Sequence, residues 1–285
     1  MFQYIFIVIL SNIIRIFPLK VVRQFKYPIG FVYYLFTPKS SFRLHRRRKF
    51  LRDSGINNYS PLLVKIYYAQ YWIETLWLNT KIINYPENFV SINDIDTVNK
   101  IINKKVGFII ALPHHGNWEY AIPAGNRIGL DLVAVAEPLS NKRILNWFVS
   151  LRTSLGCKII LGGKNSNQFN KIKNELENGK AVCLVSERHL LKAGAPTNFF
   201  NKIAAFPTGA IKLSLITGCP ILPTTCIATK DGFEIYFGRP FYVPHFGNES
   251  QSINNGLSTL AKEFENLISI DPNQWHSLMP VWSDE

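Results

Sequence analysis

The segment VGFIIALPHHGNWEYAIPAGNR, residues 106–127, decides the fold. Its first seven residues are apolar or glycine, which is typical of a strand buried on both faces of a sheet. Pro113 ends this strand, Gly116 permits a tight turn, and Asn117 is suited to cap the helix predicted over 117–127. A buried strand followed at once by a helix is the repeating unit of a parallel α/β sheet.

The same alternation continues on both sides of this segment. Upstream, residues 61–79 predict a long apolar and aromatic helix. Downstream, strands are predicted at 132–136, 157–161, 181–186, 219–228 and 233–238, and helices at 141–155, 168–178, 206–217 and 252–268. We therefore expect an α/β fold with a mostly parallel central sheet flanked by helices.

The charge of the chain is unevenly distributed. The 285 residues carry a formal net charge of +13, and eleven of the 32 Lys and Arg lie in the first 52 residues, where no Asp or Glu occurs. The chain is 47% apolar and only 18% charged, which excludes a disordered protein and indicates an apolar partner besides the core. A positive charge confined to one end favours a local anionic surface, and no nucleic-acid-binding motif accompanies it. We expect an anionic membrane as a partner and no nucleic acid.

The first 52 residues combine apolar runs with a basic block. Tyr4–Leu10 is unbroken and apolar, but Arg15 and Pro18 interrupt the pattern before the roughly 18 apolar residues that a spanning helix needs. A second apolar run covers 27–36, and six of the thirteen residues at 40–52 are Lys or Arg. This combination is typical of helices that lie in the interface of an anionic membrane.

These patterns predict two parts. Residues 1–39 form an N-terminal, membrane-associated helical segment on the cytoplasmic face of the plasma membrane, and residues 40–285 form the second domain. Arg46, Arg47 and Arg48 are expected to contact anionic lipid. The alternative is that these helices belong to the core of the body and carry a solvated basic face.

The cysteines predict no metal site. Cys157, Cys183, Cys219 and Cys226 form no C-x-x-C pair and have no histidine at ligand spacing. We expect buried free thiols in a reducing compartment, and neither a metal nor a cofactor.

The turn after the first strand is the candidate for chemistry. In an open α/β sheet, ligands bind beyond the carboxyl ends of the strands, where this turn lies. His115 and Glu119, four residues apart, can meet on one helix, whereas His114 reaches Glu119 only from outside the helix. Either pair supplies a base and a group that orients it. The alternative is a structural histidine with a capping glutamate. No G-x-S-x-G, P-loop or G-x-G-x-x-G motif occurs.

PHHGNWE, residues 113–119, resembles the H-x4-D/E box of bacterial glycerolipid and glycolipid acyltransferases. The closest form is the H-F-G-N-W-E of the lipid A biosynthesis acyltransferase family, from which this chain departs by placing His115 at the usual apolar position. The resemblance makes His114 the catalytic histidine and Glu119 its acidic partner.

Four further blocks resemble the same family, at 133–156, 184–200, 206–223 and 272–282. Two residue pairs are similar to those of the phosphatidylinositol mannoside acyltransferase branch: Trp275-His276 in the last block and Glu187-Arg188 in the second.

The resemblance also implies substrate-binding roles for five residues. These are Glu137, Arg152, Glu187, Gly116 and Asn117. As alternatives, Glu137 and Arg152 form a structural ion pair, and Glu187 caps the turn that follows its strand.

The resemblance implies a membrane-associated acyltransferase. It would move a fatty acyl chain from acyl-CoA or acyl carrier protein to a sugar hydroxyl of a glycolipid, with a phosphatidylinositol mannoside as the expected acceptor. His114 would act as general base, Glu119 would orient it, and backbone N–H groups near Gly116 would stabilise the oxyanion. The alternatives are a lipid A precursor acyltransferase, an esterase or phospholipase, and a membrane-surface binding protein whose site has decayed.

Overall fold

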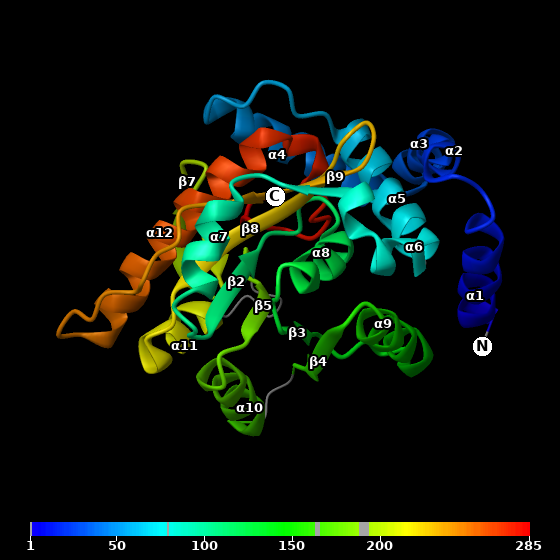
Figure 1. Cartoon of the computed structure of the whole chain (residues 1–285). Coiled ribbons are helices and arrows are strands. Elements are labelled where there is room, and N and C mark those ends of the chain that lie inside the picture. Colours follow the sequence, from blue (N-terminus) through cyan, green and yellow to red (C-terminus); the bar gives the residue numbers. More distant parts are fainter. Residues whose placement is uncertain (1, 79, 163–165, 188–193) are drawn as a thin grey trace.

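A seven-stranded sheet lies between two layers of helices in the computed structural model, which describes residues 2–78, 80–162, 166–187 and 194–285 (Figure 1). The strand order is β1-β9-β8-β2-β5-β3-β4. The strands are β1 (Val90–Ile92), β2 (Phe108–Leu112), β3 (Leu132–Ala136), β4 (Cys157–Leu161), β5 (Ala181–Val185), β8 (Ile221–Ala228) and β9 (Phe233–Phe237). Neighbours pair in parallel except β8 and β9. The expected α/β fold with a mostly parallel sheet is confirmed.

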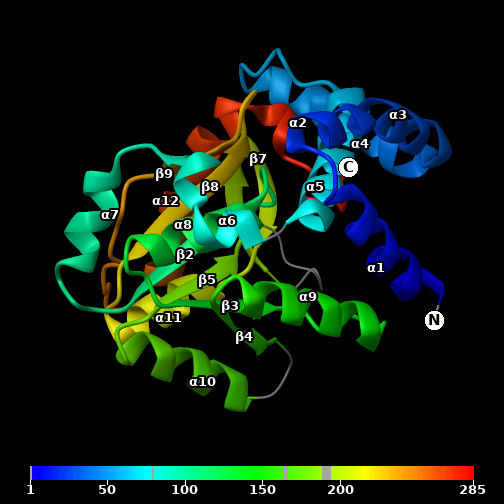
Figure 2. The ribbon, with the colours of Figure 1, turned by 45° about the vertical axis from the view of Figure 1, so that its right-hand side comes forward.

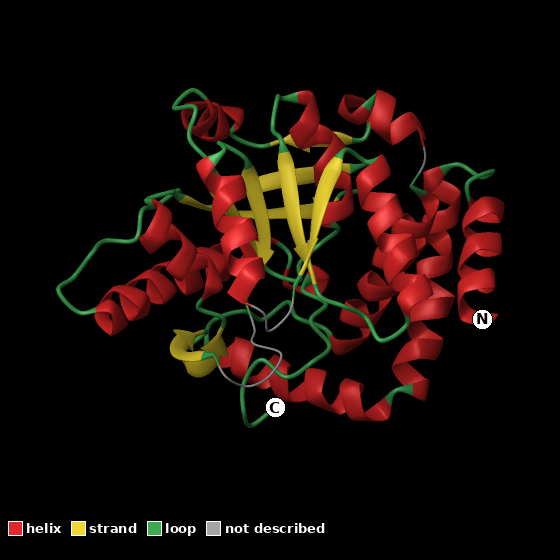
Figure 3. Ribbon diagram, turned by 90° about the horizontal axis from the view of Figure 1, so that it is seen from below, coloured by secondary structure: helices red, strands yellow, loops and turns green. Residues whose placement is uncertain are grey.

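Alternate residues of the central strand face two separate cores. In β2, Ile109 and Ala111 pack into the core formed with α10 (Ser166–Glu177), α11 (Gly209–Thr217) and α12 (Glu249–Ile270). Ile110 and Leu112 pack into the opposite core, together with α7 (Ile95–Ile102), α8 (Ala121–Arg127) and α9 (Lys142–Ser154). Figure 3 shows helices on both sides of the sheet. Burial on both faces explains why the strand is apolar without alternation.

Three parts of the body were not expected from the sequence. The short β1 lies at the sheet edge beside β9, and α7 follows it. A separate antiparallel hairpin joins β6 (Ala195–Phe199) to β7 (Lys202–Phe206). Because β7 occupies Phe206, α11 begins at Gly209 and not at residue 206 as predicted.

The N-terminal helices pack on one long helix of the body. They are α1 (Phe2–Ile14), α2 (Leu19–Val22), α3 (Lys26–Phe36) and α4 (Pro38–Asp53), and the long helix is α5 (Pro61–Trp77), which the short α6 (Thr80–Asn84) follows. A Cβ on Gly30 would lie 2.4 Å from Cα of Ile66, so α3 and α5 are in close backbone contact. Figures 1 and 2 both show α1 at the outer edge of the molecule. Among the described helices, none is long and apolar enough to cross a bilayer.

One residue of the basic block faces inward. Arg47 is fully buried, and its Nη1 donates a hydrogen bond to the carbonyl of Ser277 at 2.6 Å while its guanidinium pairs with Glu285. Arg46 and Arg48 are exposed. The expectation that all three arginines contact lipid is therefore corrected for Arg47, because helical spacing turns the middle residue toward the body.

Candidate active site

His114 and Glu187 occupy equivalent positions after two adjacent strands. His114 lies two residues beyond the end of β2, and Glu187 lies two residues beyond the end of β5. These strands pair in parallel with Leu112 opposite Val185, so the chain emerges from both at the same edge of the sheet. Nδ1 of His114 lies 2.5 Å from Oε1 of Glu187, and the side chains are 26% and 0% exposed. A carboxylate only accepts hydrogen bonds, so with Glu187 as a carboxylate the imidazole proton lies on Nδ1 and Nε2 is the basic nitrogen.

Glu119 has a different partner from the one expected. Both of its oxygens accept hydrogen bonds from Arg152, at 2.6 to 3.1 Å, and the carboxylate is completely buried. No hydrogen bond within the described residues joins Glu119 to His114. The short 3-10 helix of Trp118–Tyr120 begins directly after Asn117 and turns Glu119 toward α9. Glu119 therefore does not orient His114 as predicted; it pairs with the guanidinium of Arg152.

Burial and pairing act in opposite directions on Arg152. Burial lowers the pKa of its guanidinium, but the Glu119 carboxylate outweighs this effect and the pKa of Arg152 is raised. Arg152 therefore stays charged at physiological pH. The ion pair considered between Arg152 and Glu137 does not appear among the described residues, where Glu137 is exposed just beyond β3.

The turn between His114 and Glu119 is fixed from within the body. Gly116 has φ +70°, and a Cβ there would lie 2.0 Å from the carbonyl oxygen of Cys226. The side chain of Asn117 caps Glu119 N–H at 3.3 Å, as expected, and also donates to Glu74. Both Gly116 and Asn117 are buried, so they support the turn from the side away from solvent.

The expected oxyanion donors are already occupied. The N–H of Gly116 donates to the carbonyl of Gln274 at 3.1 Å, and the N–H of Asn117 donates to the carbonyl of Cys226 at 2.6 Å. Since each N–H makes one good hydrogen bond, these two groups are not available to a reacting oxygen, and the expectation is corrected for Gly116 and Asn117.

His115 is a structural histidine. Its Nε2 donates to the carbonyl of Asp271 at 2.8 Å, and its Nδ1 lies 3.0 Å from the hydroxyl of Thr225. Burial lowers the pKa of His115 to about 4. The ring is neutral at physiological pH and its hydrogen bonds are internal, which supports the choice of His114 as the reactive histidine.

A cavity of about 910 Å³ opens beside His114 on the α8 side of the sheet. Its walls are largely apolar and come from β2, β3, α8 and α9, including Ile110, Leu112, Ile122, Leu132, Leu145 and Phe148. His114, Arg152 and Glu137 are polar groups in its lining. A large apolar cavity with a few polar groups is typical of a site for an apolar ligand with one reactive end.

A family model for bacterial lipid A biosynthesis acyltransferases matches residues 1–284 of the chain. The chain belongs to this family. Two curated relatives are phosphatidylinositol mannoside acyltransferases. The protein of Mycobacterium tuberculosis is 31% identical over 229 residues, covering 75% of this chain and 67% of the relative. The protein of Mycolicibacterium smegmatis is 30% identical over 223 residues, covering 75% and 69%. The chain is therefore an acyltransferase enzyme.

Arg188, from the family resemblance, and the four cysteines, from their spacing, are placed only in part. Arg188 lies outside the described residues. Cys157, Cys219 and Cys226 are buried free thiols as expected, whereas Cys183 is partly exposed and lines the cavity. Within the described ranges, no group of three or more His, Cys, Asp or Glu side chains is arranged to hold a metal ion.

Sequence reasoning missed the partnership of Glu187 with His114 and the contacts that His276 makes with the turn. An acid directly after the predicted strand 181–186 was visible at 187, and its similarity in place to His114, which also follows a buried strand, would have been a usable signal. For His276 the only signal in the sequence was the family-like Trp275-His276 pair. Its hydrogen bond to Gly116 joins residues 160 positions apart and could not be read from a local pattern.

Proposed function

We propose that this acyltransferase moves a fatty acyl chain from an acyl thioester to a sugar hydroxyl of a glycolipid, with a phosphatidylinositol mannoside as the acceptor. The observation that carries the proposal is that His114, paired with the buried Glu187, lies on the wall of an apolar cavity. The cavity suits the acyl chain, and the names of the relatives favour the acceptor. Acyl-CoA and acyl carrier protein both provide the required thioester.

The pair performs the transfer as a base and its orienter. Nε2 of His114 takes the proton of the sugar hydroxyl while that oxygen attacks the thioester carbonyl. The tetrahedral intermediate collapses, the carbon–sulfur bond breaks, and the imidazolium returns the proton to the departing thiolate. Glu187 holds the productive tautomer and stabilises the imidazolium without taking the proton itself. No covalent acyl-enzyme forms.

Arg152 provides a fixed positive charge on the wall of the same cavity. Its Nε and Nη2 atoms bind Glu119, and the family resemblance gives it a substrate-binding role. We assign to it the stabilisation of negative charge on the substrate or the intermediate. Glu137 is exposed and lines the cavity. We assign to it the binding of the sugar headgroup, because a carboxylate accepts hydrogen bonds from hydroxyl groups.

Product analysis tests this function. Purified protein is incubated with palmitoyl-CoA and a phosphatidylinositol mannoside, and lipids are identified by mass spectrometry while free thiol is followed with a dye. We expect acylated glycolipid and thiol in equal amounts, and neither with His114→Ala. Thiol release with free fatty acid and no glycolipid product would support the hydrolase alternative. Acylation of a lipid A precursor but not of the mannoside would support the other branch of the family.

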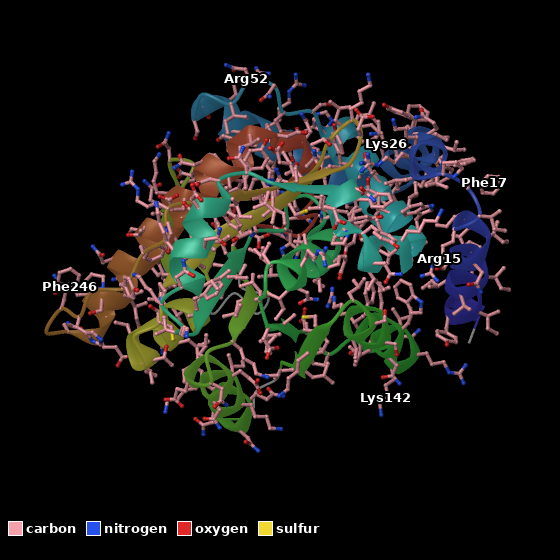
Figure 4. The ribbon with its side chains drawn as sticks, viewed as in Figure 1. Arg15, Phe17, Lys26, Arg52, Lys142 and Phe246 are labelled. Atoms are coloured by element: carbon pink, nitrogen blue, oxygen red, sulfur yellow. The ribbon has the colours of Figure 1, made fainter. Side chains whose placement is uncertain are left out.

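We also propose that α1 to α4 dock on the cytoplasmic face of the plasma membrane. Large apolar side chains are exposed along these helices and in the turn between α1 and α2, among them Phe6, Ile9, Ile16, Phe17, Phe31 and Phe36. Phe17 stands at the outer edge of the molecule (Figure 4). An exposed apolar surface of this extent marks an interaction site, and the exposed Arg46 and Arg48 beside it favour anionic lipid.

Vesicle co-sedimentation tests the docking. Deleting residues 1–39 would remove helix α3 from α5, so surface substitutions are the cleaner test. We expect the double variant Phe6→Ser, Ile9→Ser to pellet less with all vesicles. The double variant Arg46→Gln, Arg48→Gln should pellet less, by up to about tenfold, only with anionic vesicles and at low salt. Unchanged pelleting of both variants would show that the protein binds through another surface.

A further inference from the structure

The turn that carries His114 is paired with a distant segment of the chain, residues 271–279, which we call the strap. The N–H of His276 donates to the carbonyl of His114 at 3.0 Å, and the carbonyl of Gln274 accepts from Gly116 at 3.1 Å. His115 and Trp275 form an antiparallel bridge between the two segments. Figure 1 shows the red strap beside the green turn that precedes α8. The strap thus binds the backbone on both sides of the reactive histidine.

The side chain of His276 makes a further contact with the turn. Its Nε2 lies 2.8 Å from the carbonyl oxygen of Gly116. A carbonyl only accepts, so Nε2 carries the proton and donates it. The ring is buried, and its centroid lies 4.9 Å from that of Tyr71 and 6.0 Å from that of Trp118, whose own ring contacts His114 edge-on at 5.8 Å. His276 therefore lies between the turn and the aromatic rings of Tyr71 and Trp118.

The strap is itself anchored at its far end. Arg43 of α4 donates to the carbonyl of Leu278 at 2.6 Å, and Arg47 donates to those of Ser277 and Met279. Hydrogen bonds from a charged guanidinium to a carbonyl are strong, and losing the buried one to Ser277 would leave a buried polar group unpaired. The strap therefore forms a fixed support, with His276 as its contact point on the turn.

The turn has little freedom to compensate for the loss of this contact. Gly116 is held against Cys226 on one side and by His276 on the other. Without the His276 donor, the Gly116 carbonyl is buried and unsatisfied, and the turn must shift to reach another donor. A shift of His114 of about 1 Å relative to the substrate is enough to cost on the order of 100-fold in rate.

We propose that His276 is a positioning residue of the acyl transfer, which holds the Gly116 carbonyl and thereby the orientation of His114 toward Glu187. This inference rests on the proposed function of His114 as the base. It assigns a role to a buried histidine that touches neither the cavity nor the reacting atoms.

Paired substitutions separate positioning from bulk stability. His276→Phe keeps the ring but removes the donor, whereas in His276→Gln the amide nitrogen stands the same number of bonds from Cβ as Nε2. We expect His276→Phe to lower kcat for thioester turnover by about 100-fold with KM for acyl-CoA changed less than twofold, and His276→Gln to restore most of kcat. Leu260→Ala, in the core on the other side of the sheet, serves as a control that lowers Tm without lowering kcat at 20 °C.

A spectroscopic measurement keeps the inference testable apart from turnover. The proton between Nδ1 of His114 and Glu187 is followed by NMR on histidine-labelled protein. We expect its resonance to shift or broaden in His276→Phe and to return in His276→Gln. An unchanged resonance, wild-type kcat in His276→Phe, or equal kcat losses in both variants would overturn the positioning role. Absence of glycolipid product from wild-type protein that still releases thiol would instead count against the proposed acceptor.

Discussion

The carboxylates of Glu119 and Glu187 are both fully buried but have different partners. Glu119 binds a guanidinium with both oxygens, whereas Glu187 binds an imidazole with one. A guanidinium keeps its charge, whereas a neutral imidazole has one nitrogen that can accept a proton. The Glu119–Arg152 pair is therefore electrostatically constant, and the His114–Glu187 pair is the one that can respond to proton transfer.

The largest effect is expected on the catalytic side of this comparison. Glu187→Gln removes the negative charge and offers an N–H to Nδ1, which favours the tautomer whose Nε2 is protonated and not basic. We expect turnover to fall by about 10³ to 10⁴-fold while circular dichroism shows a folded protein. Thiol release from acyl-CoA measures the rate. A variant with more than a tenth of the wild-type rate would contradict the assignment of Glu187.

A smaller effect, on stability, is expected from the other carboxylate. Glu119→Gln leaves the largely buried Arg152 without its counter-charge, which costs about 3–5 kcal/mol in the free energy of unfolding. Adding Arg152→Met removes the unpaired charge, so the double variant should recover much of this loss. Urea unfolding of the single and double variants gives the coupling energy. A coupling below about 0.5 kcal/mol, as for exposed pairs, would show that the pair does not hold the turn.

The smallest effect concerns the histidines that stay neutral. Burial lowers the pKa of His115 and of His276 to about 4, whereas the unfolded chain protonates near pH 6.5. The unfolded state therefore binds more protons between these values, so the stability contribution is complete above pH 6.5 and is lost as the pH falls toward 4. We expect up to about 3 kcal/mol per histidine.

Urea unfolding at pH 7.5, 5.5 and 4.5 measures this dependence. His276→Gln should show a shallower loss than the wild type because one of the two groups is gone. His245→Gln, at an exposed position outside the turn and the strap, serves as the control variant. Parallel slopes for wild type and His276→Gln would mean that His276 is not kept neutral by the fold.

Most of the sheet could be predicted because its strands are short, largely apolar runs bounded by polar or turn residues. β3 and β4 begin and end at the predicted residues, although β4 lies at the sheet edge and is only partly buried. The hairpin of β6 and β7 could not be predicted in the same way. Its turn places Phe200 and Asn201 at φ 49° and 60°, a conformation usually signalled by Asn-Gly, and Phe gives no such signal.

The candidate site was predicted less completely than the fold. His114 follows from the strand, the turn and the family motif, and the same motif assigned Glu119 as its partner. The partner that the structure supplies, Glu187, depends on β2 and β5 being neighbours, although β3 and β4 separate them in sequence. Strand order is a tertiary property, and local patterns in one sequence do not contain it.

A kinetic double-variant cycle on His114 and Glu187 tests the central claim most directly. Turnover of acyl-CoA with glycolipid is compared for His114→Ala, Glu187→Gln and the double variant. If Glu187 acts only through His114, the double variant should be within about threefold of His114→Ala, because residues that act as one unit are not additive. Losses that multiply in the double variant, or a His114→Ala rate near that of the wild type, would contradict the account.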